Sequence, residues 1–148
     1  MKRLSLVLAG LCLVAGMAMA QTNEVTSVNV VGYYKITIPP SNKYTLVSLN
    51  LDSIDPTNQN LNGIFGSQLR SGASPALADR VYIYNPGSGS YTTFARKSTD
   101  GLYYNTASWT GSASNRTIVS GEAFWLLAKG GATTNYDVTI MGEVVSVG

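Results

Sequence analysis

The sequence predicts an all-β protein, either a β-sandwich or a partly open antiparallel barrel of about seven to nine short strands. Short runs rich in Val, Ile, Thr and Tyr recur along the chain, and strands favour these residues. Turn-forming Gly, Pro, Asn and Asp separate the runs, at the spacing of about 8–12 residues typical of all-β folds. No segment has a sustained helical period. The stretch 61–69 comes nearest, and it predicts at most one short helical turn because Gly63 and Gly66 weaken a helix there.

The expected strands follow from alternation and from the residues that end each run. The first run ends at Pro39 and Pro40, which cannot continue a sheet ladder, and Gly32 marks a break inside it. The full set of expected strands is 25–38, 44–51, 80–85, 90–96, 102–105, 117–119, 123–128, 136–141 and 144–147. An eight-stranded outer-membrane barrel is the rival fold, but it needs strands of about 9–11 residues with regular lipid-facing alternation. Few runs here reach that length.

Three local patterns give the most specific expectations. The runs 80–85 and 90–96 flank Pro86-Gly87-Ser88-Gly89, which predicts a β-hairpin with a four-residue turn. The run 123–128 (AFWLLA) is apolar on both strand faces, so we expect a central strand that is covered on both sides. Gly142 interrupts the last alternating run and predicts a bulge.

The N-terminus has the pattern of a cleavable export signal. Lys2 and Arg3 precede the uncharged, mostly apolar stretch 4–16, and Ala18 and Ala20 are small residues where a signal peptidase cleaves. The apolar stretch is shorter than the ~20 residues that a membrane-spanning helix needs. We therefore expect residues 1–20 to be a cleaved signal peptide, and the protein to be secreted, whether extracellular, on the cell surface or periplasmic.

Cleavage after Ala20 would leave residues 21–148 as a single all-β domain. Cys12 would leave with the signal, so the mature chain would be cysteine-free; Leu11 before it does not fit a lipoprotein signal. Loss of Lys2 and Arg3 takes the ten basic residues to eight, equal to the eight acidic ones. A neutral domain with scattered charges is a poor partner for nucleic acid, and no membrane span is expected after cleavage.

The composition excludes most enzyme chemistries. The chain has no histidine, and without histidine or cysteine it lacks the usual catalytic triads, zinc ligand sets and haem ligands. No phosphate-binding or dinucleotide-binding glycine motif occurs. A carboxylate pair for glycoside cleavage would have to come from Asp52, Asp55, Asp79, Asp100, Glu122, Asp137 and Glu143. Most of these lie beside turns, where Asp caps the backbone, so we expect no enzyme, no cofactor and no metal.

Two clusters leave a binding function open. The loop with Asp52, Asp55, Asn58 and Asn60 is rich in the oxygen ligands that Ca²⁺ prefers, although a polar turn is favoured because the spacing is not that of an EF-hand loop. Aromatic residues near turns could stack on sugars as an exposed platform, namely Tyr91, Tyr103, Tyr104 and Trp109. Packing in the core or on a sheet face is the favoured role for such tyrosines.

The order of short motifs resembles a family of small secreted bacterial β-domains found in planctomycete- and verrucomicrobia-type genomes. The segments that carry the resemblance are 30–33 (VVGY), 44–49 (YTLVSL), 64–66 (IFG), 81–85 (VYIYN), 89–91 (GSY), 120–125 (SGEAFW) and 142–144 (GEV). Ser120 stands where the family has Pro, and Ala123 where it has Gly. The family has no assigned activity, so the resemblance implies the fold and export but no site residue.

These observations favour a secreted or cell-surface, non-catalytic structural or interaction domain. Its partners would be further copies of itself or other cell-surface proteins, with the extended ends 25–31 and 144–147 donating strands to a neighbour's sheet edge. The alternative for these ends is pairing within their own sheet. The alternative function is a carbohydrate-binding module that holds polysaccharide on the exposed Tyr and Trp residues.

Overall fold

The computed structural model describes residues 31–40, 42–111, 113, 116–129 and 131–144. The predicted signal peptide 1–20, and the parts 25–30 and 145–147 of the predicted end strands, lie outside these residues. No helix within the described ranges is long and apolar enough to cross a bilayer.

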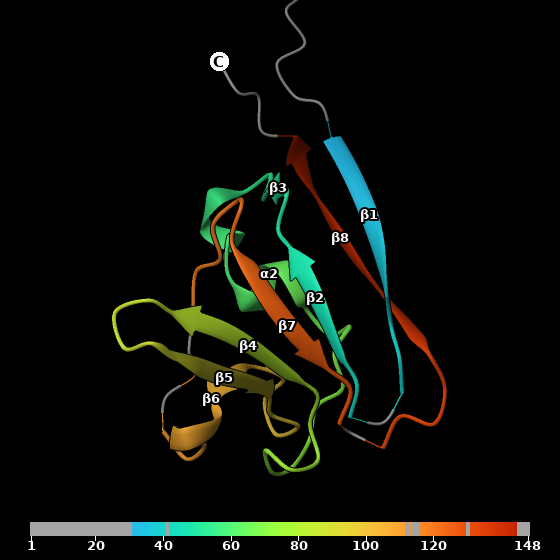
Figure 1. The fold of residues 1–148 in the computed structure, drawn as a ribbon, viewed down its shortest axis with the longest axis vertical. Helices are drawn as coiled ribbons and strands as arrows, with labels where there is room; N and C mark the ends of the chain where they lie inside the picture. The colour runs from blue at the N-terminus through green and yellow to red at the C-terminus, as the bar shows by residue number, and fades with distance from the viewer. Residues whose placement is uncertain (1–30, 41, 112, 114–115, 130, 145–148) are drawn as a thin grey trace, which may run out of the picture.

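Within the described residues, eight strands form two antiparallel sheets (Figure 1), which confirms the predicted fold class. The three-stranded sheet has the order β1 (Val31–Ile38), β8 (Tyr136–Val144) and β3 (Leu51–Asp52). The five-stranded sheet has the order β2 (Tyr44–Ser48), β7 (Ala123–Leu127), β4 (Arg80–Asn85), β5 (Ser90–Arg96) and β6 (Tyr103–Asn105). Both sheets are open, with edge strands at their ends, as in a sandwich or a partly open barrel.

The hairpin of β4 and β5 has the predicted bounds. Arg80 pairs with Ala95 at one end and Asn85 with Ser90 at the other. The Asn85 side chain accepts a hydrogen bond from the Gly87 backbone N–H at 3.0 Å, and Gly89 has a φ of 61° that favours glycine. Local turn chemistry therefore sets this register.

The predicted helical turn is the five-residue helix α2 (Leu61–Phe65). The Asn60 side chain caps it by accepting a hydrogen bond from the Gly63 N–H at 3.1 Å. Two single-turn 3₁₀ helices that the sequence did not predict accompany it, η1 (Pro56–Asn58) and η2 (Thr106–Ser108). Both begin after a side chain, Asp55 or Asn105, that caps the turn.

Both sheets and α2 contribute to one hydrophobic core. Phe65 of α2 is fully buried and lies edge-on to Phe124 of β7, with 5.6 Å between ring centroids. Its ring also lies 6.3 Å from Tyr103 of β6. From the other sheet, Ile38, Val138 and Ile140 complete the same cluster. The helical turn thus fills the space between the two sheets.

Several predicted strand details differ in the structure. β1 runs through Gly32 without a break, and the run 44–51 divides into β2 and β3, which join different sheets. The expected strand 117–119 is reduced to one isolated bridge between Thr117 and Asn60. These differences arise because tertiary pairing overrides local propensity.

The predicted bulge at Gly142 is wrong. The β1–β8 ladder is continuous there, and Gly142 pairs directly with Gly32. A Cβ at Gly142 would overlap the backbone carbonyl of Asp52 on β3, whereas a Cβ at Gly32 would make ordinary contacts at 3.5 Å with Leu51 and Val144. A residue without a side chain is therefore needed at position 142, because the backbone of β3 comes close to it.

We expect Gly142→Ala to destabilise the protein by about 1–3 kcal/mol, because β3 must move away from β8. Gly32→Ala is the matched control, and its effect should stay within about 1 kcal/mol. Urea unfolding followed by circular dichroism measures both. Equal effects of the two substitutions would contradict the close-approach argument.

The described parts of the two chain ends pair within their own sheet. Val31 pairs with Glu143, and Val144 pairs with Leu51. Pairing within the sheet is thus observed for these residues, and strand donation by 25–30 or 145–147 stays a prediction. β1 is an edge strand of its sheet.

A buried carboxylate connects three segments near the end of β7. Asp79 is 1% exposed. Its Oδ1 accepts a hydrogen bond from the Lys129 N–H at 2.7 Å, and its Oδ2 accepts from the Arg70 N–H at 3.0 Å and the Tyr136 hydroxyl at 2.6 Å. The Arg70 guanidinium lies over the Tyr136 ring, 5.1 Å from its centroid.

Two tyrosines should make stability fall at alkaline pH. Burial raises the pKa of Tyr136, reinforced by its hydrogen bond to Asp79, and burial also raises the pKa of Tyr103. A raised folded-state pKa means that the neutral form stabilises the fold. The free energy of unfolding should therefore hold up to about pH 10 and decrease above it. Urea unfolding between pH 8 and 11 measures this decrease, and Tyr136→Phe should weaken it; an unchanged decrease would show that Tyr136 is not responsible.

Candidate binding face

The outer face of the five-stranded sheet is rich in aromatic side chains. Alternation along each strand sends one set of residues into the core and the other set outward. The pairing aligns Leu46, Trp125 and Tyr82 in one outward row across β2, β7 and β4. Thr93 on β5 pairs with Tyr82 and continues the row. Four neighbouring strands thus place these side chains side by side.

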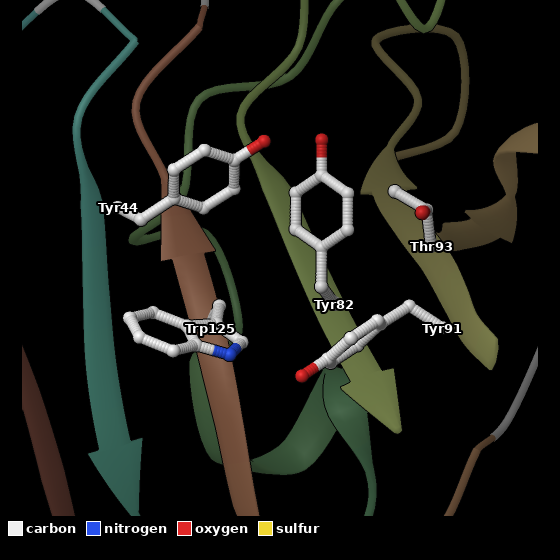
Figure 2. Close-up of a pocket in the computed structure, with 5 residues that line it drawn as sticks. All are labelled: Tyr44, Tyr82, Tyr91, Thr93 and Trp125. Carbon is white, nitrogen blue, oxygen red and sulfur yellow. The ribbon is translucent and has the colours of Figure 1, made fainter. Parts of the chain in front are cut away.

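A hollow of about 570 Å³ lies on this face, and we call it the aromatic groove. Its lining residues are Tyr44, Tyr82, Tyr91, Thr93 and Trp125. Figure 2 shows them rising from β2, β4, β5 and β7 around a common space. The Tyr44 ring lies 5.5 Å from Tyr82 and 6.2 Å from Trp125, both edge-on. The rings are therefore placed by strands and by one another before any ligand arrives.

The residues on the opposite side of the same strands hold the groove in place. Val47, Phe124 and Leu126 point into the core and are at most 6% exposed. Strand β7 is central, between β2 and β4, as the sequence predicts. Its predicted cover on both faces is wrong for the first part of the strand, because on the outer side Ala123 is exposed and Trp125 is half-buried, and only Leu127 is buried there. The apolar character of both faces thus reflects a core on one side and an open aromatic surface on the other.

The polar atoms of the groove are neutral groups. Tyrosine and threonine hydroxyls and the indole N–H line it, and no charged side chain does. Arg80 lies beside it, where its Nη1 donates to the Tyr82 hydroxyl at 3.4 Å, while Nε and Nη2 donate to the Pro75 carbonyl. Hydrogen bonding with Tyr82 raises the pKa of Tyr44. The lining itself therefore offers neutral hydrogen-bonding edges and apolar ring faces, with the Arg80 guanidinium beside it.

The four aromatic residues named from the sequence do not form one surface. Tyr91 lines the groove and is 52% exposed. Its ring centroid lies 5.3 Å from that of Tyr84. Tyr103 is fully buried against Phe65, and its hydroxyl donates to the Gly66 carbonyl. Tyr103 is thus unavailable for stacking, which corrects the prediction for that residue.

Tyr104 and Trp109 form a separate packed cluster. Tyr104 is 7% exposed, and its ring lies 5.8 Å from Trp109. Lys97 Nζ lies 4.7 Å from the Tyr104 centroid and 5.9 Å from the Trp109 centroid, and Trp109 Nε1 donates to the Ala73 carbonyl. These contacts hold the 97–109 segment in place. Because Tyr104 is buried within them, it is also unavailable for stacking on a ligand, which corrects the prediction for that residue.

Sequence reasoning missed four of the five lining residues: Thr93 and the three aromatic residues Tyr44, Tyr82 and Trp125. Their signal was the period-two alternation in YTLVS, VYIYN and AFWLL, where aromatic residues occupy one face and aliphatic or phenylalanine residues the other. The residues named from their position near turns include two that are buried, Tyr103 and Tyr104.

The candidate carboxylates mostly have structural partners. Asp55 accepts hydrogen bonds from Thr57, and Asp100 accepts from Tyr104; these bonds lower the pKa of each carboxyl. Asp137 accepts from Thr37 and pairs with Lys35 at 3.1 Å. Such contacts are those of turn caps and cross-strand pairs.

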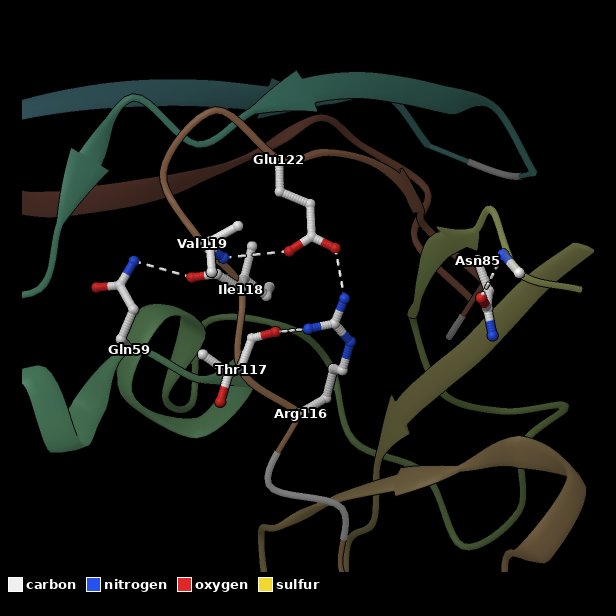
Figure 3. A network of polar contacts seen from close by, with 8 residues as sticks. Gln59, Asn85, Arg116, Thr117, Ile118, Val119 and Glu122 are labelled. Carbon is white, nitrogen blue, oxygen red and sulfur yellow. Dashed lines mark hydrogen bonds and ion pairs between the residues drawn. The ribbon is translucent and has the colours of Figure 1, made fainter. Parts of the chain in front are cut away.

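Glu122 belongs to a second polar network, which Figure 3 shows at close range. Its carboxylate accepts a hydrogen bond from the Val119 N–H and forms an ion pair with Arg116. Gln59 Nε2 donates to the Ile118 carbonyl at 2.9 Å. A hollow of about 400 Å³ lies beside Arg116, whose charge Glu122 offsets. The network fixes the 116–122 segment against the core.

Three of the four side chains considered as Ca²⁺ ligands, those of Asp55, Asn58 and Asn60, make hydrogen bonds within their own loop and to α2. Asp55 accepts from Thr57 and from the Asn58 side chain, and Asn60 caps α2 and donates to the Thr57 carbonyl. Across the described residues, no group of three or more acidic, His or Cys side chains could hold a metal ion. The favoured interpretation as a polar turn accounts for these contacts.

Comparison with protein-family models, with curated proteins and with solved structures gives no match to this chain. The resemblance to the small secreted bacterial β-domains stays a prediction.

Proposed function

We propose that this protein is a non-catalytic interaction domain, exported to the cell surface or beyond, which binds its partner with the outer face of the five-stranded sheet. The observation that carries the proposal is the aromatic groove, where Tyr44, Tyr82, Tyr91 and Trp125 surround an open hollow. Tyr and Trp are the residues that most often dominate binding energy at interfaces.

The exposure of this face supports the proposal. Around the groove, Tyr44 is 55% exposed, Leu46 58% and Tyr84 46%. Leaving contiguous apolar side chains in water costs free energy that folding alone does not recover, and such patches mark interaction sites. The rigid sheet beneath them lowers the ordering cost of binding.

The chemistry of the remaining residues supports a non-catalytic role. The sequence lacks histidine, and the carboxylates Asp55, Asp100 and Glu122 accept hydrogen bonds that fix turns and segments. An acid–base pair requires groups that face a common substrate. The groove itself has no carboxylate among its lining residues.

We expect Trp125→Ala to abolish partner binding while the protein stays folded. The exported protein would be labelled fluorescently, and its retention on cells of the producing organism would be measured, alongside light scattering over a range of concentrations. Tyr33→Ala is the matched control, because Tyr33 is 76% exposed on the other sheet. Loss of retention or of self-association in Trp125→Ala alone supports the proposal. Wild-type behaviour of Trp125→Ala in both measurements would overturn it.

A further inference from the structure

We propose that the aromatic groove binds a chain of neutral sugar residues that runs across strands β2, β7, β4 and β5. This inference rests on the function proposed above, and it names the chemical class of the partner. Three properties of the groove carry it: its linear extent across the strands, its combination of ring faces with neutral hydroxyls, and the pairing of both edges of the two strands beneath its middle, β7 and β4.

The groove has the shape for a linear ligand that lies across the strands. Its lining residues come from four neighbouring strands, with Tyr44 toward one end and Tyr91 toward the other. Neighbouring strands lie about 4.8 Å apart, so the row extends about 14 Å. Its volume of about 570 Å³ falls in the range of about 300–1,000 Å³ usual for small-molecule sites.

The chemistry of the lining suits a neutral sugar. A sugar ring has apolar C–H faces, which pack on aromatic rings, and hydroxyl groups at its edge, which need hydrogen-bonding partners. Trp125, Tyr44 and Tyr82 supply the rings, while the tyrosine and Thr93 hydroxyls and the indole N–H supply neutral donors and acceptors. No charged side chain is among the described residues that line the groove. The neighbouring Arg80 guanidinium donates to the Pro75 carbonyl and the Tyr82 hydroxyl, so we expect neutral sugars to be preferred over an anionic polymer.

The backbone beneath the groove argues against an extended peptide. Peptides that add to a sheet pair with the free N–H and C=O groups of an edge strand. Strands β7 and β4, under the middle of the groove, each have a neighbour on both sides, so their backbone groups are used within the sheet. β2 is an edge strand, but a peptide paired with its edge would extend the sheet beside the groove and would not cover Trp125. A ligand across the middle of this face therefore binds through side chains.

Affinity gel electrophoresis of the exported protein in soluble polysaccharides tests the inference. The panel is hydroxyethyl cellulose, xyloglucan, laminarin, galactomannan and starch as neutral polymers, with alginate as the anionic one. We expect at least one neutral polymer to retard the protein, with little dependence on salt. Trp125→Ala and Tyr82→Ala should weaken this binding about tenfold or more. Tyr33→Ala, the exposed aromatic control on the other sheet, should bind as the wild type does.

The outcomes separate this inference from the proposed function. Failure of every neutral polymer to retard the protein would overturn sugar binding. If Trp125→Ala still loses cell retention or self-association, the interaction domain stands with a protein partner. Retardation by alginate alone, removed by salt, would also overturn the inference. Equal retardation of the wild type and Trp125→Ala by a neutral polymer would place sugar binding elsewhere and overturn the role of the groove.

Discussion

Asp79→Ala is expected to lower the free energy of unfolding by about 3–5 kcal/mol, because each buried donor left without a partner costs about 1–3 kcal/mol. The substitution would remove the acceptor of the Arg70 and Lys129 N–H groups and of the Tyr136 hydroxyl. These donors lie on two parts of the chain that are far apart in sequence, at residue 70 and at residues 129–136. The carboxylate is 1% exposed, so water does not readily replace it.

Urea unfolding at pH 7, followed by tryptophan fluorescence and circular dichroism, measures this loss. Asp137→Ala is the matched control, since Asp137 is exposed and pairs with Lys35 at the surface, and such pairs contribute about 0–1 kcal/mol. Asp79→Asn should fall between, because the amide keeps one accepting oxygen. A cost for Asp79→Ala no larger than that of the control would show that these parts of the chain hold together without the carboxylate.

Phe65→Ala is expected to cost about 3–5 kcal/mol, the range for removing a large aromatic side chain from a core. Phe65 is fully buried and contacts rings on two strands of the five-stranded sheet, Phe124 and Tyr103. Helix α2 has only five residues and is too short to be stable by itself. Its packing against the five-stranded sheet depends on this ring.

The same unfolding measurement tests the role of Phe65, with two controls. Phe65→Leu keeps most of the volume and should cost less, while Leu77→Ala, at a side chain that is 59% exposed, should change stability by less than about 0.5 kcal/mol. A double-mutant cycle with Phe124→Leu should give a coupling of about 0.5–1.5 kcal/mol for the edge-on pair. A cost of Phe65→Ala below 1 kcal/mol would mean that α2 does not hold the sheets together.

The elements that local chemistry specifies were predictable from the sequence. The β4–β5 hairpin has its predicted bounds because its turn residues are contiguous with the strands they join. A short helical turn within 61–69 was expected from helical spacing. The structure has it at Leu61–Phe65, where the Asn60 side chain caps its first turn. The division of 44–51 between two sheets was not predictable, because it depends on partners far along the chain.

The candidate site was only partly predictable for the same reason. Periodicity shows that 123–128 is apolar on both faces, but it does not tell whether the second face has a covering layer. Tyr103 and Tyr104 are adjacent in sequence and both buried, because one meets Phe65 in the core and the other meets Lys97 and Trp109. The requirement for glycine at position 142 likewise comes from the backbone of Asp52, which is far away in the sequence but close in space.

The position of β8 has a consequence for when this chain can fold. β8 is the last strand along the described residues, yet it is the middle strand of its sheet and pairs with both β1 and β3. The contact between Lys35 and Asp137 joins residues 102 positions apart. Closing such long loops is slow, and the three-stranded sheet has no centre until residues 136–144 have been synthesised. Before that point β1 and β3 would lack their partner strand, so we expect this part of a precursor with the predicted export signal to stay unfolded, as passage through a membrane channel requires.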